Sequence, residues 1–305
     1  MSRHVVVGAG ATGIATARQL ADSGEQVRLV TRRGSGPVHP AIERVAADAT
    51  GSERLTELVT GATTLFNCAM PSYDRWPTDW PPLAAALLTA AERTGAGYVM
   101  LGNLYGYGPV DGPFSEDLPL APTTIKGQVR AAMWNEALAA HQAGRVRVAE
   151  VRASDFLGAA AASVYTLIVL PQMLAGEPAS YPADLDAPHS WTYAGDAARV
   201  LIAVSQGDRS WGRAWHVPST TDVSARELTT RLADAAGAPG AKLERMSAEE
   251  LDEIAAGNSI MAEVVEMQYL FQRPLLVDSS QAERAFGLRP TPLGDVLAET
   301  VRGAA

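Results

Sequence analysis

Three glycines that directly follow a short apolar segment constrain the fold of this chain more than any other feature. Gly8, Gly10 and Gly13 have the spacing G-x-G-x-x-G and lie between a strand-like segment and an Ala-rich amphipathic one. In such a turn the first glycine allows a tight bend, the second lets the backbone approach a pyrophosphate, and the third lets helix and strand pack closely. The helix N-terminus adds free amide groups and partial positive charge. We therefore expect the turn, including Ala11 and Thr12, to bind a dinucleotide.

Short β-rich segments then alternate with helical ones, which predicts an α/β fold with a doubly wound parallel Rossmann sheet. The expected strands cover residues 4–7, 27–31, 44–46, 64–68, 98–101, 147–151 and 214–218. The expected helices cover residues 13–23, 50–59, 82–93 and 124–142. We predict a dinucleotide-binding domain over residues 1–155 whose core also includes about 188–223. Residues 156–187 and 224–305 would form a smaller, mostly helical substrate lobe, with a short extended piece at 274–278.

Charge and composition limit the partners of the chain. The formal net charge of −9 disfavours a general affinity for nucleic acid or an anionic membrane, because no basic excess exists to neutralise phosphates. The single cysteine, Cys68, excludes an intramolecular disulfide and fits a reducing cytoplasm. The five histidines are scattered without ligand spacing, so we expect no metal site. We expect a cytoplasmic protein with a small-molecule substrate, and a homodimer stays open.

The end of the second expected strand bears on the choice of cofactor. Proteins that select NAD usually have Asp or Glu there, hydrogen-bonded to the ribose 2′-hydroxyl. This chain has Thr31, Arg32 and Arg33, and a guanidinium can bind a 2′-phosphate. NADP(H) is therefore favoured, and NAD(H) is the alternative if both arginines are only solvated loop residues. Asp48, after the third strand, could accept a hydrogen bond from the adenine amino group or could be a turn residue.

Several later segments resemble the extended short-chain dehydrogenase/reductase family, the NAD(P)-dependent epimerase/dehydratase group. In chain order they are residues 67–69 (NCA), 105–109 (YGYGP), 115–120 (SEDLPL), 152–158 (RASDFLG) and 278–282 (DSSQA). The resemblance extends over nearly the whole chain and implies that Asn67 and Ala69 lie beside the cofactor. One departure is Thr16, which stands where the family's usual G-x-x-G-x-x-G turn has its third glycine.

The usual catalytic groups of this family are incomplete. Its members carry a Tyr-x-x-x-Lys pair on the helix after the fifth strand, and a Ser or Thr at the end of that strand. Lys126 stands in a plausible place for the lysine, but Pro122 occupies the position of the tyrosine. Residues 101–103 (LGN) contain neither Ser nor Thr. Lys126 is expected to bind the nicotinamide ribose and act in catalysis, and a solvated surface lysine is the alternative.

Nearby side chains could replace the missing groups. Tyr105 and Tyr107, on the loop after the fifth strand, are candidate proton donors, and packing beneath the second lobe is their alternative role. Asn103 is a candidate amide donor in place of the serine. Trp76 and Trp80, in a Pro-rich segment after the fourth strand, could line a substrate pocket or hold that segment onto the sheet.

Two functions follow from these observations. The first is an NADP(H)-dependent oxidoreductase of the epimerase/dehydratase type, acting on a carbonyl or hydroxyl of a small molecule with a non-standard active site. The second is a catalytically inactive NADP(H)-binding sensor or regulatory protein. The missing tyrosine and serine favour the sensor, whereas the lysine, the second lobe and the aromatic segment favour the enzyme.

Overall fold

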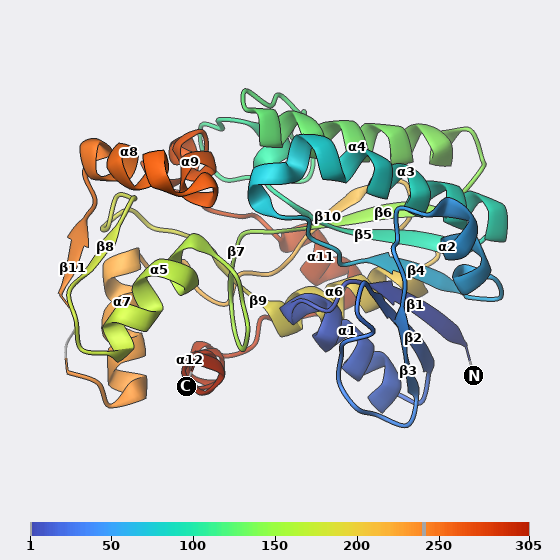
Figure 1. Cartoon of the computed structure of the whole chain (residues 1–305), viewed down its shortest axis with the longest axis horizontal. Helices are drawn as coiled ribbons and strands as arrows, with labels where there is room; N and C mark the ends of the chain where they lie inside the picture. The colour runs from blue at the N-terminus through green and yellow to red at the C-terminus, as the bar shows by residue number, and fades with distance from the viewer. Residues whose placement is uncertain (1, 240–241, 305) are drawn as a thin grey trace.

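A seven-stranded parallel sheet forms the centre of the computed structural model, which describes residues 2–239 and 242–304 (Figure 1). Its strand order is β10-β6-β5-β4-β1-β2-β3. The strands are β1 (Arg3–Val7), β2 (Gln26–Thr31), β3 (Ile42–Ala46), β4 (Thr64–Asn67), β5 (Gly97–Asn103), β6 (Val148–Ala153) and β10 (Ala214–His216). All seven expected strands are confirmed, with their ends displaced by at most two residues. The strand order reverses between β1 and β4, the place where doubly wound sheets bind ligands at their carboxyl edge.

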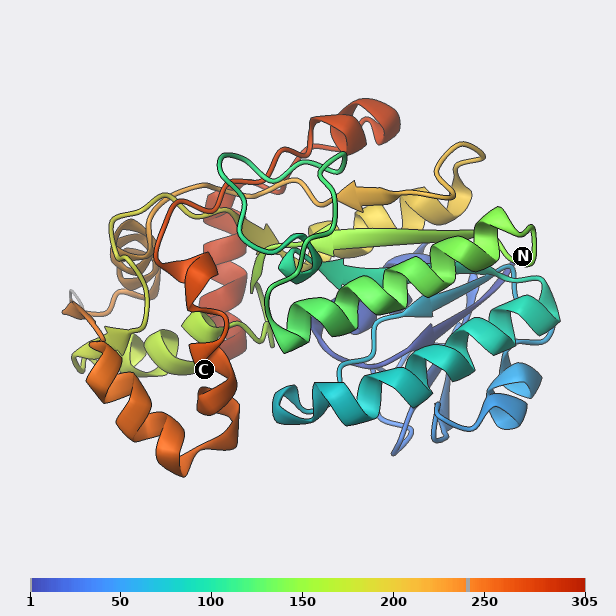
Figure 2. The same cartoon turned by 90° about the horizontal axis from the view of Figure 1, so that it is seen from above.

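Helices cover both faces of this sheet (Figures 1 and 2). One face carries α2 (Ser52–Val59), α3 (Trp76–Thr94) and α4 (Ile125–Gln142), and the other carries α1 (Ala11–Asp22), α6 (Ala194–Gln206) and α11 (Ser280–Phe286). Two separate hydrophobic clusters fill the spaces between sheet and helices. Because both faces are covered, a central strand such as β4 is buried along its whole length. The Rossmann prediction is confirmed.

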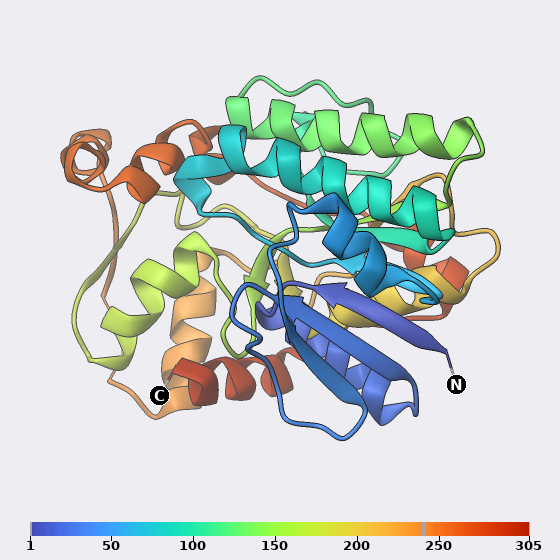
Figure 3. The same ribbon diagram turned by 45° about the vertical axis from the view of Figure 1, so that its right-hand side comes forward.

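The remaining elements form a smaller, mostly helical lobe with its own hydrophobic cluster (Figure 3). Its helices are α5 (Val164–Leu174), α7 (Ala225–Ala236), α8 (Ala248–Gly257), α9 (Ser259–Val265), α10 (Gln268–Phe271) and α12 (Leu293–Ala304). Its short strands, β7 (Asp155–Leu157) with β9 (Trp191–Tyr193) and β8 (Ala179–Tyr181) with β11 (Leu243–Arg245), pair in parallel. The extended piece expected at 274–278 makes only isolated bridges, at Leu275 and Val277. The residue boundaries between the two parts stay a prediction.

Helix α3 begins six residues before the expected start, so the Pro-rich segment expected as a loop is helical. Pro77 lies in the first turn, where its missing N–H is not needed. Pro81 and Pro82 lie further inside and each removes an intrahelical hydrogen bond. Burial of Trp76 and Trp80, one turn apart, offsets this loss. The two tryptophans therefore fix the helix on the sheet.

Across residues 2–239 and 242–304, no helix combines the length and the apolar character that a membrane crossing requires. The same residues contain no group of three or more His, Cys, Asp and Glu side chains arranged to hold a metal ion.

Candidate functional site

The glycine turn joins β1 to α1 as expected, but its three glycines have different reasons to be glycine. Gly8 has φ +103°, and a Cβ there would overlap the carbonyl oxygen of Cys68. A Cβ on Gly13 would overlap the carbonyl oxygen of Gly8. A Cβ on Gly10 would meet no described atom within 4 Å. Packing therefore demands the first and third glycines, whereas the position of a side chain on Gly10 is open.

A cleft of about 710 Å³ opens beside this turn, at the carboxyl ends of β1, β2, β3 and β4. The residues expected at the cofactor that line it are Gly8, Gly10, Thr31, Arg32, Arg33, Asp48 and Ala69. Gly10 is also the N-cap of α1, and no described side chain caps that helix end. The helix end beside Gly10 therefore contributes partial positive charge to the adjoining part of the cleft. A cleft of this volume with an uncapped helix end fits a dinucleotide with its pyrophosphate beside Gly10.

The arginines after β2 are exposed and line the cleft. Neither Arg32 nor Arg33 forms an ion pair or a side-chain hydrogen bond with another residue that the structure describes. Asp48 accepts hydrogen bonds from the amide (3.0 Å) and the hydroxyl (2.8 Å) of Thr50. These bonds lower the pKa of Asp48, and the charge of Arg32 adds to the effect. Asp48 therefore forms a turn and also faces the cleft, so both of its expected roles stay compatible with the geometry.

Other residues expected at the cofactor do not line the cleft. Ala11, Thr12 and Gly13 lie inside the first turn of α1, where Thr12 accepts a hydrogen bond from the Thr16 hydroxyl at 2.8 Å. Asn67 is buried; its amide donates to the hydroxyl of Tyr98 at 3.2 Å, and its oxygen accepts from the amide of Ala69. The side chain of Asn67 therefore stabilises the loop after β4, in which Ala69 lines the cleft.

The two candidate tyrosines face different surroundings. The hydroxyl of Tyr105 accepts a hydrogen bond from the hydroxyl of Tyr73 at 3.3 Å. Burial raises the pKa of both tyrosines, and the carboxylate of Asp155 raises the pKa of Tyr105 further. Asn103, at the end of β5, uses its side-chain oxygen to accept from the amide of Tyr105 at 3.2 Å. Asn103 thus shapes the turn that carries Tyr105.

Tyr107 belongs to a buried network under the second lobe. Its hydroxyl lies 2.8 Å from Nε2 of His216, whose Nδ1 lies 3.0 Å from the carbonyl oxygen of Asp278. Because a carbonyl oxygen only accepts, the hydrogen of His216 is on Nδ1, and Tyr107 donates to Nε2. Burial lowers the pKa of His216 to about 4. The hydroxyl proton of Tyr107 is therefore committed to a neutral histidine and is not directed at the cleft.

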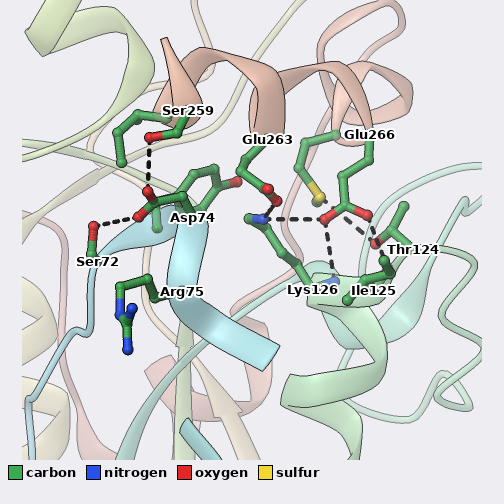
Figure 4. A network of polar contacts seen from close by, with 12 residues as sticks. Ser72, Asp74, Arg75, Thr124, Ile125, Lys126, Ser259, Glu263 and Glu266 are labelled. Atoms are coloured by element: carbon green, nitrogen blue, oxygen red, sulfur yellow. Dashed lines mark hydrogen bonds and ion pairs between the residues drawn. The ribbon is translucent and has the colours of Figure 1, made fainter. Parts of the chain in front are cut away.

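Lys126 is completely buried at the start of α4 (Figure 4). Its Nζ donates to the carboxylate of Glu263, and to Oε1 of Glu266 at 3.3 Å. It also lies 4.5 Å from the centre of the Tyr73 ring. Glu266 in turn accepts from the amides of Ile125 (2.9 Å) and Lys126 (3.3 Å) and so caps α4. Two carboxylates therefore compensate the lysine charge.

Arg130 lies one turn after Lys126 on the same helix and was not expected at the site. Its guanidinium lies 4.7 Å and 4.5 Å from the ring centres of Trp76 and Trp80, and its Nη1 donates to the carbonyl oxygen of Leu101 at 3.3 Å. Burial lowers its pKa to about 10. Arg130 thus supplies a second buried cation at this edge of the sheet. The four-residue spacing from Lys126 was the sequence signal that could have identified it.

A second polar cluster lies where the lobes meet. Asp155, at the start of β7, and Nε2 of His189 lie 2.8 Å apart. The Tyr181 hydroxyl is buried and has no hydrogen-bond partner among the described residues. The carboxylate of Asp155 raises the pKa of Tyr181 as well as that of Tyr105, which indicates that both phenols lie in its field. These groups come from separate segments, and no sequence spacing pointed to them.

Comparison with known proteins gives a family and a set of similar structures. A sequence model of the NAD dependent epimerase/dehydratase family matches residues 4–217. A search among curated protein sequences finds no significant match. A dTDP-glucose 4,6-dehydratase from Bacillus anthracis, solved in complex with NAD, is 17% identical with a TM-score of 0.79, over 99% of this chain and 96% of that one.

Two further structures have the same fold. A UDP-glucuronic acid 4-epimerase from Bacillus cereus, in complex with UDP-glucuronic acid and NAD, is 17% identical with a TM-score of 0.79, over 99% and 98% of the two chains. A double mutant of a dTDP-glucose 4,6-dehydratase from Streptomyces venezuelae is 22% identical with a TM-score of 0.76, over 99% and 96%. At such identities the likeness establishes a shared fold, including the second lobe.

Proposed function

Because the chain belongs to the NAD dependent epimerase/dehydratase family, we propose that it is an NADP(H)-dependent oxidoreductase acting on a carbonyl or hydroxyl of a small molecule. The observation that carries this proposal is the cleft of about 710 Å³ between the uncapped N-terminus of α1 and Arg32 and Arg33 after β2, which have no ion-pair partner among the described residues. The similar structures hold NAD, which supports a nicotinamide cofactor here. Two guanidinium groups in place of a carboxylate support the phosphorylated form.

Each part of the cleft would hold a different part of the cofactor. The backbone at Gly8 and Gly10 would bind the pyrophosphate, Arg32 and Arg33 the 2′-phosphate, and Asp48 the adenine. Lys126 and Asn67 are not among the lining residues and would act by holding neighbouring residues in position. When bound, the cofactor supplies hydride transfer to or from a carbon of the substrate.

Tyr105 is the best candidate to move a proton. Its oxygen already accepts from Tyr73, so its own hydrogen is free to donate to a substrate oxygen. A tyrosine phenol is protonated near neutral pH, so Tyr105 would start as a proton donor and not as a base. Burial raises its pKa, so a bound substrate would have to stabilise the phenolate that forms. Asn103 would orient Tyr105 by fixing its turn, and Tyr107 would support the second lobe through His216. Proton donation from Tyr105 corresponds to reduction of a carbonyl.

The cluster of Asp155, His189 and Tyr181 would surround the substrate. The unpartnered Tyr181 hydroxyl, which is buried, is expected to have a ligand or water as its partner. The Asp155 carboxylate offers acceptors to substrate hydroxyl groups. This arrangement suits a small hydroxylated molecule.

A second function is supported by one observation. Lys126 is fully buried and already neutralised by Glu263 and Glu266, so its charge is not available in this arrangement. A protein of this design could bind NADP(H) and change the contact between its lobes without turning over a substrate. That protein would be a sensor or regulator.

Turnover separates the two functions. Oxidation of NADPH would be followed by its absorbance with a panel of aldehydes, ketones and quinones, for the wild type and Lys126→Ala. Lys242→Ala is the matched control, because Lys242 is exposed and pairs with Glu244, away from the cleft. We expect turnover in the wild type and the control, and a loss of about 100-fold in Lys126→Ala, since Lys126 holds Tyr73 and the second lobe in position. Cofactor binding without turnover in any class would favour the sensor.

A further inference from the structure

The wall of the cleft opposite the glycine turn carries a third arginine. The loop after β4, the short 3₁₀ helix Tyr73–Arg75 and the start of α3 provide this wall, including Ser72, Arg75, Asp79 and Leu83. In Figure 4 the Arg75 side chain points away from the cluster around Lys126. Arg75 therefore belongs to the cofactor cleft and not to the contact between the lobes.

Asp79 holds the Arg75 guanidinium in one orientation. Nε of Arg75 lies 2.9 Å from Oδ2 of Asp79, and Nη2 lies 2.8 Å from Oδ1, so two parallel hydrogen bonds join the planar groups. This pairing spans one turn of helix and leaves Nη1 without a partner among the described residues. A fixed guanidinium with a free edge loses less side-chain entropy when it binds an anion than a freely rotating one does.

The charges around the cleft favour an anionic ligand. Three guanidinium groups, those of Arg32, Arg33 and Arg75, face two carboxylates, those of Asp48 and Asp79. Both carboxylates have internal partners: Asp48 accepts from Thr50, and Asp79 accepts from Arg75. The charge of Arg32 lowers the pKa of Asp79, so Arg32 and Asp79 lie close enough across the cleft to interact. The uncapped end of α1 adds partial positive charge on the facing wall.

We propose that Arg75 is a further cofactor-binding residue, which donates from its free Nη1 edge to a phosphate of the dinucleotide from the wall opposite the glycine turn. This proposal rests on the proposed function, namely that the cleft holds NADP(H). Two phosphate groups of the cofactor could be its partner, the pyrophosphate or the 2′-phosphate. The first occurs in both NADPH and NADH, and the second only in NADPH, so the two cofactors distinguish these sources.

The test is the dissociation constant of NADPH and of NADH for the whole protein, measured by titration calorimetry. The variants are Arg75→Gln and Arg75→Lys, with Arg93→Gln as the matched control. Arg93 lies near the end of α3, the helix that Arg75 directly precedes, and pairs with Glu53, outside the cleft. We expect Arg75→Gln to weaken NADPH binding by about 10-fold, as removal of a charge-assisted hydrogen bond does. Arg75→Lys, which keeps the charge without the planar fork, should lie between that variant and the wild type.

The pattern across the two cofactors decides the proposal. An equal loss for NADPH and NADH assigns Arg75 to the pyrophosphate, and a loss confined to NADPH assigns it to the 2′-phosphate. Unchanged affinity for both cofactors in Arg75→Gln, while the wild type binds them, overturns the role of Arg75 and leaves the proposed function intact. Absence of binding by the wild type would instead remove the proposed function. Thermal unfolding of each variant confirms that the fold is kept, as an exposed position with 62% of its side chain accessible should allow.

Discussion

At the scale of single residues, the glycine turn separates what the fold needs from what a ligand needs. Gly8 and Gly13 are required by backbone contacts within the chain, whereas Gly10 has open space where its side chain would be. The sequence spacing predicted the turn correctly, but it could not rank the three positions. That distinction depends on atoms of Cys68 and Gly8 brought close by packing.

We predict that two substitutions in this turn affect different properties, one the stability of the protein and the other its affinity for NADPH. Gly13→Ala should destabilise the protein by about 1–3 kcal/mol, because the added methyl group overlaps a backbone oxygen. Gly10→Ala, at φ −75°, should change the free energy of unfolding by less than about 1 kcal/mol. It should nevertheless weaken NADPH binding by about 10-fold or more, since its methyl group points into the cleft. Urea unfolding and calorimetry measure the two effects. Equal destabilisation by both variants would contradict this account.

At the scale of elements, the strands were predictable because each is a short apolar run followed by a helix with conventional end signals. The start of α3 was not, since three prolines within its first two turns indicate a loop. Burial of Trp76 and Trp80 against Arg130 outweighs that local preference, and such a contact between α3 and α4 cannot be read from either segment alone. Likewise, β10 is held by contacts with distant segments. The side chain of its last residue, His216, bonds to the hydroxyl of Tyr107 and to the carbonyl oxygen of Asp278.

The buried histidine of β10 gives a prediction for pH. Its pKa in the folded protein is lowered to about 4, so the unfolded chain binds more protons between about pH 6.5 and pH 4. The contribution of His216 to stability is therefore present above pH 6.5 and is lost as the pH falls toward 4. Between pH 6.5 and 5 we expect a loss of about 2 kcal/mol from this group. In His216→Gln, urea unfolding should show a correspondingly smaller change over that interval. The same pH dependence in the variant as in the wild type would mean that His216 binds protons equally in the folded and unfolded states, contrary to this account.

At the scale of the whole molecule, the two parts meet through α9 and the start of α4. Glu263 and Glu266 reach across to Lys126 over about 140 residues of sequence, and Ser259 reaches Asp74 at 2.7 Å. The sequence predicted a smaller helical lobe over the sheet, together with a functional lysine at this position. It could not predict that the lobe neutralises this lysine, because nothing in the pattern of α9 specifies which surface it covers.

The central claim is that the cleft selects a phosphorylated nicotinamide dinucleotide through Arg32 and Arg33. The most direct measurement is the dissociation constant of NADPH and of NADH for the wild type and the double variant Arg32→Ala/Arg33→Ala. We predict that the wild type prefers NADPH, and that the double variant weakens NADPH binding by about 10-fold or more while NADH binding stays nearly unchanged. Equal losses for the two cofactors, or a wild type that prefers NADH, would contradict the assignment of these arginines to the 2′-phosphate.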